Sequence, residues 1–234
     1  MQNLRMSLVA AAIAAAATGA QAAPIGSSVG TLPGINYATA AMSGFVTTGA
    51  DMAGMVVTVN FNDNTSESAI WALTGGNSGA AMGTGWAMGL DGDSFTNSWV
   101  LVNGAKPIIG FSIDGAPGST SFDILAAVEG TPGSGAGKEF GSADSSDAAV
   151  TFASAVYSNR LFVGGTFFDD EYVKLTVRLT GELGVDQNLT FIADTDNARS
   201  RGDIIPVIPE PETYALMLAG LGVVGYTARR RRST

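Results

Sequence analysis

Histidine and cysteine are both missing from this sequence of 234 residues. Without histidine, neither a Ser-His-Asp nor a Cys-His mechanism can operate, because each uses an imidazole as the general base. Zinc also loses its usual nitrogen and sulfur ligands, which leaves only carboxylates for metal binding. Since no disulfide can form, packing and hydrogen bonds alone must hold the fold together.

Basic residues are scarce as well. The chain has 12 lysines and arginines against 21 aspartates and glutamates, for a formal net charge of −9. An excess of negative charge opposes binding to nucleic acid and to anionic lipid. We therefore expect no nucleic-acid partner, and we expect solubility outside the cell with carboxylates available for calcium.

No catalytic motif is complete. Gly137-Lys138 is not a phosphate-binding loop, because Pro132 and Glu139 stand where the motif needs a glycine and a serine or threonine. A nucleophile elbow beginning at Gly76 fails because Ala80 replaces its last glycine. We therefore predict a protein that is not an enzyme, although a glycoside hydrolase, which needs only two carboxylates across a cleft, stays open.

The first 22 residues are typical of a secretory signal peptide. Arg5 lies in a short polar start, an apolar, alanine-rich stretch follows at 8–17, and Ala20-Gln21-Ala22 is a small-x-small cleavage site. Signal peptidase removes segments of this kind. We predict a signal peptide at residues 1–22, with cleavage after Ala22, and an exported protein.

The segment that follows has the alternation of β-strands. Met55, Val57, Val59 and Phe61 share one parity, and residues 172–180 alternate between apolar and polar side chains. A period of two is the pattern of half-buried antiparallel strands. Noisier runs occur at 70–73, 95–102, 108–113, 122–128, 150–157, 161–167 and 189–193. Many short strands separated by turn residues predict an all-β fold, an antiparallel β-sandwich or jelly roll over residues 23–196.

Three stretches depart from this regularity. Residues 75–89 are rich in glycine and alanine, so we expect either a long loop or an edge strand. Residues 131–146 are rich in glycine and serine and contain an aspartate, which predicts an exposed, protease-sensitive loop. Residues 197–208 are predicted to be a linker.

Acidic residues gather in three clusters, at 91–93, 169–171 and 194–197. Calcium takes six to eight oxygen ligands from such segments, while solvated turns on an acidic surface explain the same pattern. If calcium binds, Asp194, Asp196 and Asn197 are the expected ligands, although Ala198 breaks the EF-hand spacing. No cofactor is required.

The three tryptophans raise a carbohydrate-binding hypothesis. Trp71 and Trp99 lie in apolar runs, so we assign them to the core. Trp86 lies among glycines and is the tryptophan that we expect to be exposed to a ligand.

The C-terminal end combines a turn, an apolar run and a basic cluster. Residues 213–228 are sixteen residues without a charge. A helix of that length spans roughly 24 Å, somewhat less than the hydrocarbon core of about 30 Å. Proline disfavours helix before it, so a membrane helix would begin after Pro211 and occupy about 213–228. The basic tail would stay in the cytoplasm by the positive-inside bias. It comprises Arg229, Arg230, Arg231 and Arg232.

Residues 209–234 as a whole resemble the PEP-CTERM sorting signal of Gram-negative bacteria. The resemblance rests on Pro209, Glu210 and Pro211, the apolar segment and the terminal arginines, in that order. Ile208 departs from the valine that often precedes the tripeptide. The resemblance implies that an exosortase, a membrane protease, recognises the tripeptide, cuts near it and releases or transfers the protein. It also implies bacteria that make exopolysaccharide.

Three functional hypotheses follow. The first is a non-enzymatic surface or matrix protein associated with exopolysaccharide, anchored transiently in the inner membrane before it reaches the cell surface or the medium. The second is a jelly-roll carbohydrate-binding module, which requires an exposed Trp86. The third is a carboxylate-only hydrolase, which requires two carboxyl groups about 5 to 9.5 Å apart in a cleft.

Overall fold

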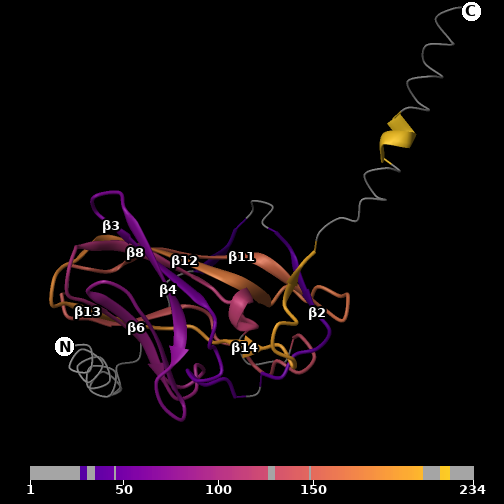
Figure 1. Cartoon of the computed structure of the whole chain (residues 1–234), viewed down its shortest axis with the longest axis horizontal. Coiled ribbons are helices and arrows are strands. Elements are labelled where there is room, and N and C mark those ends of the chain that lie inside the picture. Colours follow the sequence, from indigo (N-terminus) through magenta and orange to yellow (C-terminus); the bar gives the residue numbers. More distant parts are fainter. Residues whose placement is uncertain are drawn as a thin grey trace, which may run out of the picture.

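The computed structural model describes residues 27–30, 35–44, 46–125, 130–147, 149–207 and 217–221 of the chain. Most of the secondary structure in these residues is β-sheet (Figure 1), which confirms the all-β prediction. The predicted signal peptide 1–22, with Ala20 and Ala22, lies outside the described residues. The tripeptide 209–211 and the arginines at 229–232 also lie outside them.

The described residues up to 207 form fifteen strands and one short 3-10 helix, η1 (Ala116–Gly118). The strands are β1 (Ser27–Val29), β2 (Tyr37–Thr39), β3 (Val56–Phe61), β4 (Ser66–Leu73), β5 (Ser78–Met82), β6 (Trp86–Asp91), β7 (Trp99–Asn103), β8 (Ile108–Asp114), β9 (Thr120–Asp123), β10 (Gly141–Ser145), β11 (Phe152–Val163), β12 (Glu171–Leu183), β13 (Asn188–Ile192), β14 (Asp196–Asn197) and β15 (Ile205–Pro206).

The alternating patterns form strands as expected. In β3, Val57, Val59 and Phe61 are buried and the residues between them are half-buried. In β12, Val173, Leu175, Val177 and Leu179 are likewise buried, while Arg178 is exposed. One face of each strand therefore packs into the core, as a period of two requires.

The strands join one hydrogen-bonded sheet in the order β10-β13-β7-β6-β5-β4-β3-β8-β12-β11-β2-β15. The sheet turns within β4, whose residues 66–70 pair with β3 and whose residues 71–73 pair with β5. Most pairs are antiparallel, as predicted, but β1 and β2 both pair with β11 in parallel. β9 lies off the main path and pairs with both β12 and β14.

The core joins the two halves of this bent sheet through aromatic rings. Phe191 of β13 stacks on Trp99 of β7, with ring centroids 5.6 Å apart. The Phe191 ring also lies 5.1 Å from Phe111 of β8 and 5.4 Å from Phe140. Strands β8 and β13 are not hydrogen-bonded neighbours, so these contacts pack the half of the sheet that contains β13, β7, β6 and β5 against the half that contains β3, β8, β12 and β11. Trp71 is 1% exposed and Trp99 is fully buried, as expected of core residues.

Two expectations for the irregular stretches are wrong. Residues 75–89 contribute to the antiparallel pair β5 and β6, both of which lie inside the sheet rather than at its edge. Residues 131–146 are not an exposed loop, because Thr131, Ser134 and Phe140 are buried and residues 141–145 form strand β10.

The predicted linker is corrected as well, for its described residues 197–207. Strand β14 pairs with β9, and β15 pairs with β2. Ala198 and Ile204 are buried in a second, smaller apolar cluster with Met42, Leu161 and Val173. The end of the chain before residue 208 therefore belongs to the folded domain.

Later in the sequence than the last strand, residues 217–221 are helical (Figure 1). Among the described residues there is no helix with the length and apolar character that crossing a membrane requires.

Candidate metal centre

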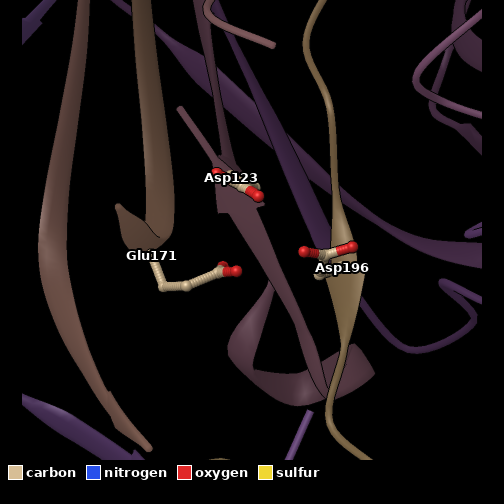
Figure 2. Close-up of side chains that lie close together, drawn as sticks. All are labelled: Asp123, Glu171 and Asp196. Atoms are coloured by element: carbon tan, nitrogen blue, oxygen red, sulfur yellow. The ribbon is translucent and has the colours of Figure 1, made fainter. Parts of the chain in front are cut away.

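Three carboxylates from distant parts of the sequence meet in one place. Asp123 ends β9, Glu171 begins β12, and Asp196 begins β14. Figure 2 shows the three side chains pointing toward one another. One ligand oxygen from each lies within 4.8 Å of the others, and all three residues are fully buried.

Strand register explains why they meet. Glu171 is directly opposite Asp123 in the antiparallel β9–β12 pair, and Asp196 is directly opposite Ser121 in the β9–β14 pair. Residues opposite each other in a sheet lie on the same face, and residues two apart in one strand share that face. Asp123, Ser121, Glu171 and Asp196 therefore form one polar patch across three strands. Like charges directly opposite each other destabilise a sheet, so this patch needs compensation.

Most of the polar atoms in the patch lack hydrogen-bond partners. Among the described residues, no hydrogen bond of normal geometry reaches Oδ2 of Asp123, either carboxylate oxygen of Glu171, or either carboxylate oxygen of Asp196. The fully buried hydroxyl of Ser121 has no partner either. Only Oδ1 of Asp123 is bonded, accepting from the backbone N–H of Leu125 at 2.8 Å. Buried polar groups are nearly always paired, so five unpaired carboxylate oxygens in one place require an explanation.

Two glycines cover the patch at close range. A Cβ atom at Gly44 would clash with the carboxylate of Asp196, and a Cβ atom at Gly137 would clash with the carboxylate of Asp123. The backbone thus approaches both acids more closely than a larger residue would permit. This close approach of the backbone helps to keep the carboxyl groups of Asp123 and Asp196 out of contact with solvent.

Burial controls the protonation of the cluster. It raises the pKa of Asp123 to about 7, with the charges of Asp170 and Asp194 raising it further. Burial, and then the negative charge of Asp123, raises the pKa of Glu171. For Asp196 the pKa is also raised, by burial first and by the charge of Glu171 next. In each case ionisation is unfavourable, because the charged form would lose its hydration and would be repelled by the neighbouring carboxylates.

Of the three residues predicted to bind calcium, only Asp196 joins this cluster. Asp194 is buried nearby, but its Oδ1 accepts from the Ser94 hydroxyl and the Thr195 N–H, both at 2.8 Å. Its pKa is raised to about 6, mainly by burial. The side-chain oxygen of Asn197 accepts from the hydroxyl of Thr120 at 2.8 Å.

Glu171 belongs to the acidic cluster at 169–171 in the sequence, whereas Asp123 lies outside the three clusters and was not predicted. Asp123 lies within the predicted strand run 122–128, and the only signal there is a charged residue in an otherwise mostly apolar run. The cluster at 91–93 is a set of hydrogen-bonded turns, with Asp91 accepting from Ser78 and Asp93 from the N–H of Phe95.

The expected exposure of Trp86 is wrong. Its side chain is 3% exposed in β6, and its indole N–H donates to Glu67 at 3.0 Å. A Cβ atom at Gly83 would clash with the indole, so the neighbouring glycine provides the space that the ring fills. The small residues around Trp86 reflect close packing rather than an open ligand surface.

The raised pKa values predict an unusual pH dependence for the protein in a chelator. A carboxyl whose folded pKa lies above its unfolded value, near 4, stabilises the fold at low pH, and this contribution is lost as pH rises through the folded pKa. From pH 5 to pH 8, we expect the melting temperature to fall by roughly 5 to 10 °C. The groups involved are Asp123, Asp194, Glu171 and Asp196, with Lys138 opposing the effect at Asp194.

Calorimetry across this pH range checks the expectation, and Asp123→Asn should flatten the profile because it removes one of the titrating groups. The carboxylates with lowered pKa values, such as Asp63 and Asp147, change protonation below this range. A melting temperature that is constant or rises from pH 5 to pH 8 would contradict the assignment.

Comparison with known proteins identifies the C-terminal segment. Residues 207–232 match the family model of the PEP-CTERM protein-sorting motif, which confirms the resemblance seen in the sequence. The match includes Pro209, Glu210 and Pro211 and the terminal arginines. No curated protein and no solved structure matches the chain. The motif marks the protein for export and for membrane-associated sorting by an exosortase-like protease.

Proposed function

We propose that this chain is a non-enzymatic surface or extracellular-matrix protein that associates with the exopolysaccharide of the cell that exports it. The observation that carries the proposal is the sorting motif at residues 207–232. A protein that is exported and then processed at the membrane ends at the cell surface or in the medium, where the matrix is the nearest polymer.

The proposal includes the route as well as the destination. Signal peptidase removes residues 1–22, and the apolar segment 213–228 holds the chain in the inner membrane until the exosortase-like protease acts. Its sixteen uncharged residues, followed by four arginines, support this role. The domain delivered is a β-sandwich, which the aromatic contacts between β8 and β13 support.

A structural role is favoured over the two alternatives. The three clustered carboxylates have no exposed surface, so a glycan could not reach them, whereas a glycosidase needs its pair of acids in an open cleft. A carbohydrate-binding module of the expected kind required an exposed Trp86, and that residue is buried. The chain also has no histidine or cysteine to serve as a base or nucleophile.

Extraction of the matrix from the producing cells tests the proposal. The mature protein should sediment with the high-molecular-weight polysaccharide, and it should become free in the medium of a strain that makes no polysaccharide. The extracted polysaccharide should keep its chain length after incubation with the purified protein. A protein that stays free in both strains would overturn the matrix association, and shortening of the glycan would overturn the non-enzymatic role.

A further inference from the structure

We propose that Asp123, Glu171 and Asp196 bind one calcium ion, with the Ser121 hydroxyl as a further ligand. The three carboxylates are fully buried, and their nearest ligand oxygens lie within 4.8 Å of one another. Charges removed from water are tolerated when they are paired or coordinate a metal. In the described part of the chain, the only ion pair joins Lys106 to Asp63, so no lysine or arginine there neutralises the cluster.

Ser121 gives an independent indication of a ligand. Its hydroxyl is fully buried, has no hydrogen-bond partner at normal bonding geometry among the described residues, and lies on the patch face directly opposite Asp196. It is also near enough to the Glu171 carboxyl to lower the pKa of that group, so it belongs to the same cluster of oxygens. A serine hydroxyl can both donate and accept a hydrogen bond. Burying it without a partner costs free energy that an alanine at the same position would not cost. A cation bound between the strands would be coordinated by this oxygen and by the carboxylate oxygens, so that none of them is left without a partner.

The number of available oxygens fits calcium. Five carboxylate oxygens and the Ser121 hydroxyl lack partners, which makes six, and calcium takes six to eight oxygen ligands. Magnesium normally keeps several of its own water ligands. The backbone at Gly44 and Gly137 lies close against the carboxylates and leaves little room for such waters. Zinc prefers nitrogen and sulfur ligands, and this chain has no histidine or cysteine.

The ion would tie together three strands that are otherwise joined by few residues. β14 has only two residues and β9 has four, and β14 is followed by the last folded residues, which end with β15 just before the segment that carries the sorting motif. A calcium ion shared by β9, β12 and β14 therefore fixes the short strand β14 onto the sheet, close to the C-terminal end of the folded domain. This role does not depend on what the exported domain binds.

Thermal unfolding of the full-length chain at pH 7.5 tests the site. After treatment with EDTA and dialysis, addition of calcium at about a hundredfold excess over Kd should raise the melting temperature by about 5 to 10 °C. Titration calorimetry should give one calcium ion per chain, and magnesium at the same concentration should give a much smaller shift. Absence of calcium binding to the wild-type protein would overturn the proposal, whatever the variants do.

Glu171→Gln locates the ion, because it keeps the shape of the side chain and removes one buried charge. The variant should lose the calcium response and, in EDTA, melt at a higher temperature than the wild-type protein. A residue with a purely structural role would lower both melting temperatures instead. The double variant Asp91→Asn and Asp93→Asn, in an acidic turn with exposed Asp91, is the matched control and should keep the full response. A response that survives Glu171→Gln, or that disappears in the control, would place calcium elsewhere and overturn the assignment.

Discussion

Replacement of Pro209, Glu210 and Pro211 with alanine is expected to leave the whole of the exported chain in the inner membrane with its C-terminal segment uncut. These residues form the tripeptide of the sorting motif that matches residues 207–232. Proline fixes the backbone and disfavours helix in the residue before it, so alanine would let a helix begin earlier and would remove the two prolines and the carboxylate that define the motif. The change affects recognition itself, so the effect should be nearly complete.

Intact mass spectrometry of the inner-membrane, surface and medium fractions measures this effect. The wild-type protein should lack residues 1–22 and everything after about residue 212, and it should lie at the surface or in the medium. Pro206→Ala is the matched control, because Pro206 ends β15 just before the matched segment, and this variant should still be cut. Identical masses and locations for the triple variant and the wild type would contradict the prediction. A wild-type protein found at full length only in the inner membrane would make the tail a plain anchor.

The strands with clear alternation were predictable because the signal is local. Burial on one side of a sheet imposes a period of two, and β3 and β12 carry this period without interruption. The core positions of Trp71 and Trp99 followed from the apolar runs around them. The two predicted runs at 150–157 and 161–167 are largely one strand, β11, because Ser158 and Arg160 between them pair with β12 and the chain does not turn back there.

The candidate metal centre could not be predicted because its residues are brought together by register between distant strands. Asp123, Glu171 and Asp196 lie far apart in the sequence, and each has a different neighbour in the chain. Only the pairing of β9 with both β12 and β14 places them on one face. The nearby Asp194 and Asn197 looked equally suitable in the sequence, yet their oxygens are bonded to Ser94 and Thr120.

The predictions that relied on a high content of small residues were wrong where those residues allow close packing. Glycine and alanine between residues 75 and 89 suggested a loop, but they let β5 and β6 lie close to neighbouring side chains, as Gly79 does beside the Trp71 indole. The glycine-rich residues 131–146 suggested exposure for the same reason. There, Gly137 instead brings the backbone against Asp123. A glycine that permits close approach cannot be told from a turn glycine without the partner that approaches it.

Phe191→Ala is expected to lower the free energy of unfolding by about 3 to 5 kcal/mol. Phe191 is fully buried, and its ring lies against Trp99, Phe111 and Phe140. These neighbours come from both halves of the bent sheet, so the resulting cavity would open between the halves, where strands cannot move without breaking hydrogen bonds. A loss of this size is a large fraction of the roughly 5 to 15 kcal/mol that stabilises a typical protein.

Urea unfolding in a chelator measures this loss without a contribution from calcium. Phe168→Ala is the matched control, because the same ring is removed from a side chain that is 37% exposed, and it should cost about 1 kcal/mol or less. A similar loss in the two variants would mean that the two halves do not pack through Phe191. The effect should also reach the cluster of Asp123, Glu171 and Asp196, since β13 ends at Ile192, four residues before Asp196. In Phe191→Ala, the loosened strand should hold Asp196 less firmly against β9, so calcium should bind more weakly than in Phe168→Ala.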